Sequence, residues 1–308
     1  MIFLQILLLV VGFFMLVKGA DWFVEGTAGI AEKFGIPQLV VGLTIVAMGT
    51  SAPEAAVSIT AALKENAGIS VGNVVGSNIL NILIILGVTG VITSVAVQKS
   101  TLIAEIPYML VVTVVLLIMG LTGNSINRVE GAILWIMFIV YLVYLYFLAK
   151  KGTEGESKEE RSTWKLLLYA IVGGVIVVWG SDITVDAATY IAETVGLSQR
   201  FIGLTIVAFG TSLPEFVTSV TAARKGNADI AIGNIVGSNL FNILFVLGTS
   251  SLIIPLTFET SFLIDTVIAV VAGVILWISV AKSKKLTRPW GIVMLAAYAI
   301  YLLYLFLM

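Results

Sequence analysis

Residues 42–54 read GLTIVAMGTSAPE, and residues 203–215 read GLTIVAFGTSLPE. Eleven of these thirteen positions are identical at an offset of 161 residues. At the same offset, GNVVGSNILNILIILG at 72–87 matches GNIVGSNLFNILFVLG at 233–248 in eleven of sixteen positions. Long matches at one fixed offset indicate an internal repeat. The chain therefore consists of two homologous halves that arose by duplication and fusion of one unit.

The composition places this duplicated chain in a membrane. Its 308 residues are 59% hydrophobic and 11% charged, and the mean hydropathy is +1.09, whereas soluble domains are about 25% charged. Long apolar segments with few charges are typical of transmembrane helices. The sequence predicts an all-α integral membrane protein in the lipid bilayer, with ten transmembrane helices at residues 2–20, 37–63, 69–94, 101–121, 129–149, 164–190, 200–223, 230–255, 261–281 and 289–307.

The composition also excludes several classes of function. The chain has no cysteine and no histidine, so disulfides and zinc sites of the usual kind are excluded. No nucleophile–base pair and no nucleotide-binding loop is recognisable, and no basic stretch suggests a nucleic-acid partner. We therefore expect neither an enzyme nor a bound cofactor. Residues 1–17 lack a basic start and a cleavage motif, so we expect a first membrane helix and not a removed signal peptide.

The loop charges predict how the halves face the membrane. The loops that follow the odd-numbered segments, with their flanks, carry thirteen Lys and Arg residues, against three for the even-numbered loops. Positive charge accumulates on the cytoplasmic side. We therefore expect a cell-membrane protein whose termini lie outside and whose 150–163 loop is cytoplasmic. Five helices in each half, at 1–149 and 164–308, give the two repeats opposite orientations, as in many transporters.

Glu54 and Glu215 are the main candidates for chemistry. A charged side chain at the centre of a membrane helix costs roughly 2.5–3.5 kcal/mol, and the sequence places a carboxylate there twice, at equivalent positions. Thr50 and Ser51 lie four and three residues before Glu54, so their oxygens share its helix face. Oxygen ligands without nitrogen or sulfur are typical of a hard-cation site.

Proline adds backbone oxygens to this set. Pro53 and Pro214 have no N–H, so the carbonyls four residues earlier lose their helical donors. We expect each helix to kink or break there, which would let nearby carbonyls, including those of Ala47 and Ala208, turn toward an ion. Irregular backbone within a membrane is tolerated where it lines such a site.

The 69–94 and 230–255 helices carry a second set of polar residues. Ser77 and Asn81 share one face, as do Ser238 and Asn242, and their register with the glutamates favours ligand roles. Asn73, Asn78, Asn234 and Asn239 are expected to form interhelical hydrogen bonds. Other acidic residues lie near predicted helix ends and are expected to be solvated or to cap helices: Asp21, Glu25, Glu32, Glu105, Asp182, Asp186, Glu193, Glu259 and Asp265.

With these motifs, the sequence resembles the calcium/cation antiporter superfamily, most closely the sodium/calcium exchangers and their prokaryotic relatives. The resemblance covers essentially the whole chain. It implies ten helices, with ion sites between the 37–63, 69–94, 200–223 and 230–255 segments. One Ca²⁺ and several Na⁺ would compete for overlapping sites. The implied metal ligands are the side chains or carbonyls of Glu54, Glu215, Thr50, Thr211, Ser51, Ser212, Ala47, Ala208, Ser77, Ser238, Asn81 and Asn242.

Two departures from relatives narrow this expectation. Asn242 stands where potassium-dependent and some prokaryotic relatives carry Asp, which argues against potassium co-transport. The 150–163 linker is too short for the calcium-sensing regulatory domain of animal exchangers. Regulation of that kind is therefore not expected.

The resulting hypothesis is secondary active antiport of Ca²⁺ for Na⁺ by alternating access, carried out by a monomer. The 2–20 and 164–190 helices are expected to slide against the remaining core. Proton/calcium antiport is the alternative, because the glutamates could carry protons, although hydroxyl ligands favour sodium. A passive cation channel is less favoured, because an inverted repeat with one midplane site is typical of carriers.

Overall fold

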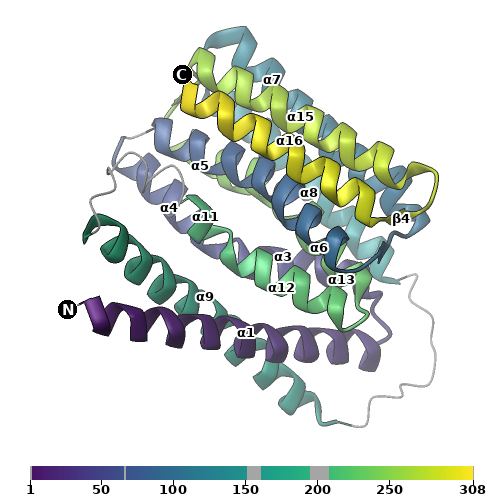
Figure 1. Ribbon diagram of the computed structural model, residues 1–308. Coiled ribbons are helices and arrows are strands. Elements are labelled where there is room, and N and C mark those ends of the chain that lie inside the picture. Colours follow the sequence, from purple (N-terminus) through teal and green to yellow (C-terminus); the bar gives the residue numbers. More distant parts are fainter. Residues whose placement is uncertain (1, 66, 151–160, 195–207, 308) are drawn as a thin grey trace.

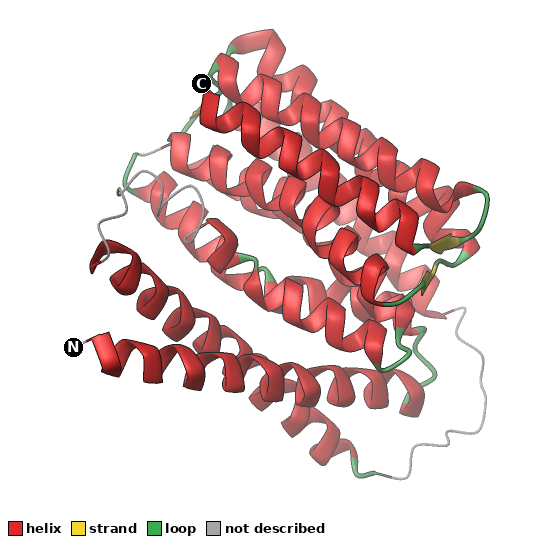
Figure 2. Cartoon of the chain, viewed as in Figure 1, coloured by secondary structure: helices red, strands yellow, loops and turns green. Residues whose placement is uncertain are grey.

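The protein is described from a computed structural model that covers residues 2–65, 67–150, 161–194 and 208–307. Figure 2 shows that this part of the chain is almost wholly helical, with short connecting loops. The helices of the first half are α1 (Ile2–Lys33), α2 (Gln38–Val41), η1 (Gly42–Val46), α3 (Ala47–Thr50), α4 (Ala52–Leu63), α5 (Ala67–Leu80), η2 (Asn81–Leu86), α6 (Gly87–Ile92), η3 (Thr101–Glu105), α7 (Ile106–Gly123) and α8 (Arg128–Lys150). Those of the second half are α9 (Thr163–Thr194), α11 (Ala208–Thr211), α12 (Leu213–Arg224), α13 (Ala228–Phe241), η5 (Asn242–Leu247), α14 (Gly248–Ile253), α15 (Thr260–Ala281) and α16 (Arg288–Leu307).

These helices account for nearly all the predicted membrane spans. Within the described ranges, eight helices are long and apolar enough to cross a membrane, and a bent pair over Gln38–Leu63 makes a ninth. The remaining predicted span, 200–223, begins outside the described residues and continues in α11 and α12. The protein is thus a multi-pass helical membrane protein.

Figure 1 shows α1 and α9 lying side by side as an outer layer along one side of the other helices. Glycines explain how closely they pack: a Cβ built on Gly26 would lie 2.4 Å from the backbone nitrogen of Ala170, and one on Gly173 would lie 2.4 Å from that of Phe23. Small residues allow membrane helices to approach this closely. The α1–α9 pair is therefore tightly packed within itself, and it contacts the other helices mainly through α2, α11 and α12.

Two short antiparallel pairs connect the halves. β1 (Val95–Ala96) pairs with β4 (Lys285–Leu286), and β2 (Ser125–Ile126) pairs with β3 (Leu256–Thr257). β1 and β3 follow equivalent helices of the two repeats, yet they belong to different pairs. Each pair thus joins non-equivalent loops, as expected for halves of opposite orientation. The two termini lie at the same end of the helices (Figure 1).

The helix over 37–63 breaks within its motif, as predicted. Ser51 leaves the helical conformation with φ −82° and ψ 9°, and the segments on either side differ in direction by 51°. Pro53 lies in the first turn of α4, where its missing N–H costs no hydrogen bond. The second half repeats the break, because Ser212 has φ −90° and ψ 7° ahead of α12.

One predicted boundary was wrong. The first helix does not end near residue 20 but continues to Lys33, so Asp21 and Glu25 lie within it and not near its end. Asp21 forms an ion pair with Lys225 at 3.2 Å, and Glu25 pairs with Arg161. Arg161 and Lys225 lie far from α1 in the sequence and compensate the negative charges of its acidic residues. The local sequence of α1 therefore does not reveal that these charges are compensated.

Candidate cation-binding site

The two helix breaks present a buried glutamate each. Glu54 and Glu215 both have 0% exposed surface. Each lies in the first turn of the helix that follows the break, α4 or α12. Unpaired N–H groups and the helix dipole favour negative charge at that position. The break therefore offsets part of the cost of placing a carboxylate inside the membrane.

Hydrogen bonds between the repeats bring the glutamates together. The Ser51 hydroxyl donates to Oε1 of Glu215 at 2.7 Å, and the Ser212 hydroxyl donates to Oε1 of Glu54 at 2.9 Å. Each serine precedes the glutamate of its own repeat by three residues and bonds to the glutamate of the other. The two motifs thus meet at a single place between α4 and α12.

Four buried oxygens at this place have no hydrogen-bond partner among the described residues. They are Oε2 of Glu54, Oε2 of Glu215, Oδ1 of Asn81 and Oδ1 of Asn242. Both asparagines are fully buried; η2, which starts at Asn81, packs against α12, and η5, which starts at Asn242, packs against α4. Buried polar atoms are rarely left unpaired. Carboxylate and amide oxygens are the ligands that hard cations prefer.

Three further predicted ligands adjoin this group in the first half. The Ser77 hydroxyl lies 3.3 Å from that of Ser212. The Thr50 hydroxyl lies 3.0 Å from both the Val46 carbonyl and Oδ1 of Asn234, so its one hydrogen can serve either acceptor. The Ala47 carbonyl accepts hydrogen bonds from the Ser51 N–H and, at 3.4 Å, from the Ser238 hydroxyl.

The predicted ligands of the second half are placed less completely. Ser212, Ser238 and Asn242 are buried. Thr211 is half-buried at the end of α11. Ala208 is the first residue of α11, next to the range 195–207 that lies outside the described residues.

Asn73 and Asn234 are not predicted ligands, but they hold the glutamate helices in place. Asn73 donates at 3.2 Å to the Glu54 carbonyl and at 2.9 Å to Ser58. Asn234 donates at 3.4 Å to the Glu215 carbonyl and at 2.8 Å to the Ser219 hydroxyl. Ser58 and Ser219 are themselves 161 residues apart, so the repeat alignment carried a signal for these contacts.

The charge of the site comes from two carboxylates alone. The described part of the chain contains no group of three or more His, Cys, Asp and Glu side chains that could hold a metal ion. Neutral hydroxyl, amide and backbone oxygens must therefore supply most of any coordination shell. Such a mixed shell suits one divalent cation, or monovalent cations in its place.

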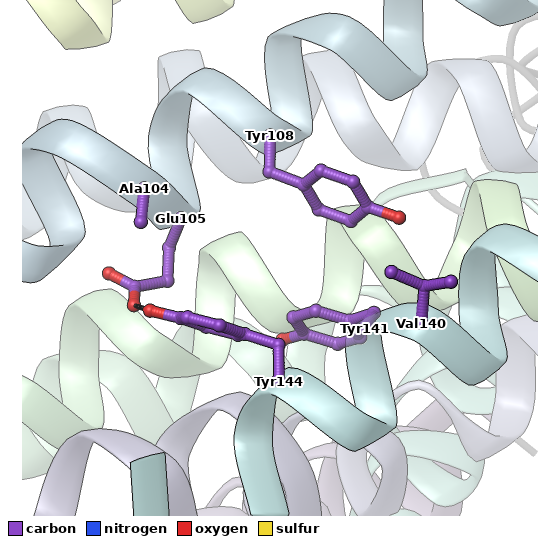
Figure 3. A pocket seen from close by; sticks show the side chains of 6 residues that line it. All are labelled: Ala104, Glu105, Tyr108, Val140, Tyr141 and Tyr144. Carbon is purple, nitrogen blue, oxygen red and sulfur yellow. Dashed lines mark hydrogen bonds between the residues drawn. The ribbon is translucent and has the colours of Figure 1, made fainter. Parts of the chain in front are cut away.

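Glu105 contradicts the expectation of a solvated or capping residue. Its exposed fraction is 1%, and its Oε1 accepts a hydrogen bond from the Tyr144 hydroxyl. It lines a hollow of about 250 Å³ between the continuous η3–α7 helix and α8, together with Tyr108, Tyr141 and Tyr144 (Figure 3). In the second half, 160 residues later, Tyr301 likewise donates to Asp265 at 3.0 Å. The carboxyl groups join neighbouring helices in both halves and lie outside the candidate site.

Comparison with known proteins shows the family and the fold of the chain. A family described as sodium/calcium exchanger protein matches residues 4–147 and again 165–307. The putative antiporter CaxA of Alkalimonas amylolytica is 35% identical over 96% of this chain and 97% of its own length. The sodium/calcium exchanger MaX1 of Methanosarcina acetivorans is 31% identical over 99% of both chains. The structure of the sodium-calcium exchanger NCX_Mj, at 33% identity, has a TM-score of 0.88 and covers 98% of this chain and 99% of its own.

Proposed function

The chain belongs to the sodium/calcium exchanger protein family of cation antiporters, which are transporters and not enzymes, and we propose that it exchanges Ca²⁺ for Na⁺ across the cell membrane. One observation carries the proposal: four buried oxygens, from Glu54, Glu215, Asn81 and Asn242, lack hydrogen-bond partners within the part of the chain that the structure describes. Leaving such atoms unpaired is costly unless a cation binds them. MaX1 and NCX_Mj are sodium/calcium exchangers, which supports Na⁺ as the counter-ion.

The proposed ligands act as one set. The Glu54 and Glu215 carboxylates neutralise one Ca²⁺, and the neighbouring neutral oxygens complete its shell. Several Na⁺ ions replace that Ca²⁺ on the same oxygens, so the two ions compete. The empty site would carry two uncompensated buried charges, which makes its passage between the two membrane faces unfavourable. Exchange is obligatory for that reason. The proposed set also includes Thr50, Thr211, Ser51, Ser212, Ala47, Ala208, Ser77 and Ser238.

The α1–α9 pair supplies the moving part of this proposal. It packs as an outer layer and contacts the core beside the broken helices. Sliding of this pair opens the site alternately to either side. In the proposed orientation both termini are external, the 150–163 linker between the repeats 1–149 and 164–308 is cytoplasmic, and the chain works as a monomer.

The counter-ion is decided by transport in proteoliposomes. Vesicles loaded with Na⁺ and diluted into Na⁺-free medium should accumulate ⁴⁵Ca²⁺, whereas a pH gradient without Na⁺ should drive no uptake. Uptake driven only by the pH gradient would establish proton/calcium antiport instead. Uptake that needs no counter-ion gradient would indicate a channel. Vesicles with the Glu54→Gln variant serve as the control for leakage.

A further inference from the structure

Four asparagines form a symmetric hydrogen-bonded cluster where the two repeats meet, which we call the asparagine clasp: Asn78, Asn81, Asn239 and Asn242. Asn78 donates to the backbone carbonyl of Asn239 at 3.1 Å, and Asn239 donates to that of Asn78 at 3.2 Å. Asn81 donates to Oδ1 of Asn239 at 2.9 Å, and Asn242 donates to Oδ1 of Asn78 at 3.1 Å. All four are buried, with at most 3% exposed surface.

The backbone carbonyls determine which way every amide in the clasp points. A carbonyl oxygen only accepts hydrogen bonds, so Asn78 and Asn239 must direct their NH₂ groups toward it. Their own Oδ1 atoms therefore face Asn242 and Asn81. An oxygen needs a donor opposite it, so Asn242 and Asn81 must present their NH₂ groups to the clasp. The amide orientations are therefore assigned from the hydrogen-bond partners. The shape of an amide group does not distinguish its oxygen from its nitrogen.

The clasp thereby leaves the Oδ1 atoms of Asn81 and Asn242 free for the ion site. With the NH₂ groups engaged, Oδ1 of Asn81 and Oδ1 of Asn242 point away from the clasp, and neither has a hydrogen-bond partner in the ranges described by the structure. A cation requires that oxygen, because an amide turned the other way would present N–H dipoles of the wrong sign. The orientation of the side chain at position 242 matters because Asn242 is an amide. An amide has only one oxygen to present to the cation, whereas a carboxylate has two.

We infer that Asn78 and Asn239 are positioning residues, which fix the amides of Asn242 and Asn81 with oxygen toward the transported cation. This inference rests on the proposed function, because it takes those two oxygens as ligands. A purely structural role would only join α5 to α13. Asn78 and Asn239 each form two hydrogen bonds that separate these roles. The bond that each donates to a backbone carbonyl links the helices. The bond that each accepts from the amide of Asn242 or Asn81 sets the orientation of that amide.

A double-mutant cycle tests the inference. Asn78→Ala releases the Asn242 amide, whereas Asn242→Asp replaces that amide by a carboxylate that presents oxygen in either orientation. In proteoliposomes, Asn78→Ala should raise the KM for Ca²⁺ about 10-fold, the effect expected for a group that orients a metal ligand, with a smaller change in kcat. In the Asn242→Asp background the same change should raise KM less than about twofold.

An equal KM increase in both backgrounds, or none with native Asn242, would overturn the inference. If Asn78→Ala does not fold, the equivalent cycle with Asn239→Ala and Asn81→Asp decides by the same criterion. The wild type in the same vesicles tests the proposed function separately. If the wild-type protein transports Ca²⁺ on a pH gradient, the mutant cycle is measured under that gradient. If the wild-type protein transports no Ca²⁺, the affinity is measured by equilibrium ⁴⁵Ca²⁺ binding in place of KM.

Discussion

At the scale of single residues, the position of each carboxylate depends on the other half of the chain. Glu54 is held by Ser212, and Glu215 is held by Ser51. The sequence identified these four residues because they recur at one offset. It could not show that each serine bonds to the glutamate of the other repeat, because that depends on how the halves pack.

Removing one of these serine hydroxyls should weaken Ca²⁺ binding. We expect Ser51→Ala and Ser212→Ala each to raise the KM for Ca²⁺ by about 10-fold, or about 1.4 kcal/mol, near the lower end for a hydrogen bond to a charged group. Uptake at varied ⁴⁵Ca²⁺ measures this. Ser283→Ala, the same change at an exposed position, should leave KM unchanged. A KM for either site variant equal to that of the wild type would contradict the hydrogen-bond assignment.

The Glu105–Tyr144 contact should affect stability and not ion affinity. Tyr144→Phe removes the hydroxyl that donates to a buried carboxyl group, a loss of about 1–3 kcal/mol. Thermal unfolding of the purified protein should shift to lower temperature, with the KM for Ca²⁺ unchanged. Tyr146→Phe is the matched control, because Tyr146 lies on the same helix and is 56% exposed. Equal unfolding temperatures for the two variants would be the contrary result.

At the scale of elements, the broken helices and the α1–α9 pair determine the architecture. The break at Ser51 was predictable, because Pro53 removes a helix donor and Gly49 loosens the turn before it. The full length of α1 was not predictable from apolar runs, since its acidic stretch is compensated by Arg161 and Lys225. The buried position of Glu105 was missed for the same reason, because its tyrosine partner lies 39 residues away on α8.

The close contact of α1 with α9 should not tolerate a methyl group at Gly173. A Cβ there would lie 2.4 Å from the Phe23 backbone nitrogen, whereas at Gly174 the nearest atom is a Phe23 ring carbon at 3.5 Å. Gly173→Ala should therefore lower stability by about 1–3 kcal/mol, as overpacking does, and slow Ca²⁺ exchange. Gly174→Ala should resemble the wild type. Thermal unfolding and ⁴⁵Ca²⁺ flux measure both, and equal behaviour of the two variants would argue against tight packing at this crossing.

At the scale of the whole molecule, the duplication links fold and function. Two copies of one unit, with equivalent loops in different strand pairs, place the same motif on both sides of one site. The sequence predicted the helical membrane fold, the repeat and the family. The interhelical hydrogen bonds of Asn78 and Asn239 were predicted and are confirmed. Their pairing in the asparagine clasp was not predictable, because it forms across the interface of the repeats.

Opposite orientation of the halves predicts opposite labelling of similar loops. The native chain has no cysteine, so a single introduced thiol reports its own position. In intact cells, a membrane-impermeant maleimide should label Thr122→Cys, in the last turn of α7. It should label Ser283→Cys, in the loop after α15, only once the cells are permeabilised. Labelling of both variants from the same side would rule out the inverted arrangement.

The most direct test of the central claim is equilibrium binding of ⁴⁵Ca²⁺ to the purified protein while Na⁺ is varied. If Glu54 and Glu215 form one shared site, Ca²⁺ should bind once per chain, and Na⁺ should displace it competitively. Glu54→Gln and Glu215→Gln should each abolish binding. Ca²⁺ binding that persists in either variant, or that Na⁺ does not displace, would contradict the account.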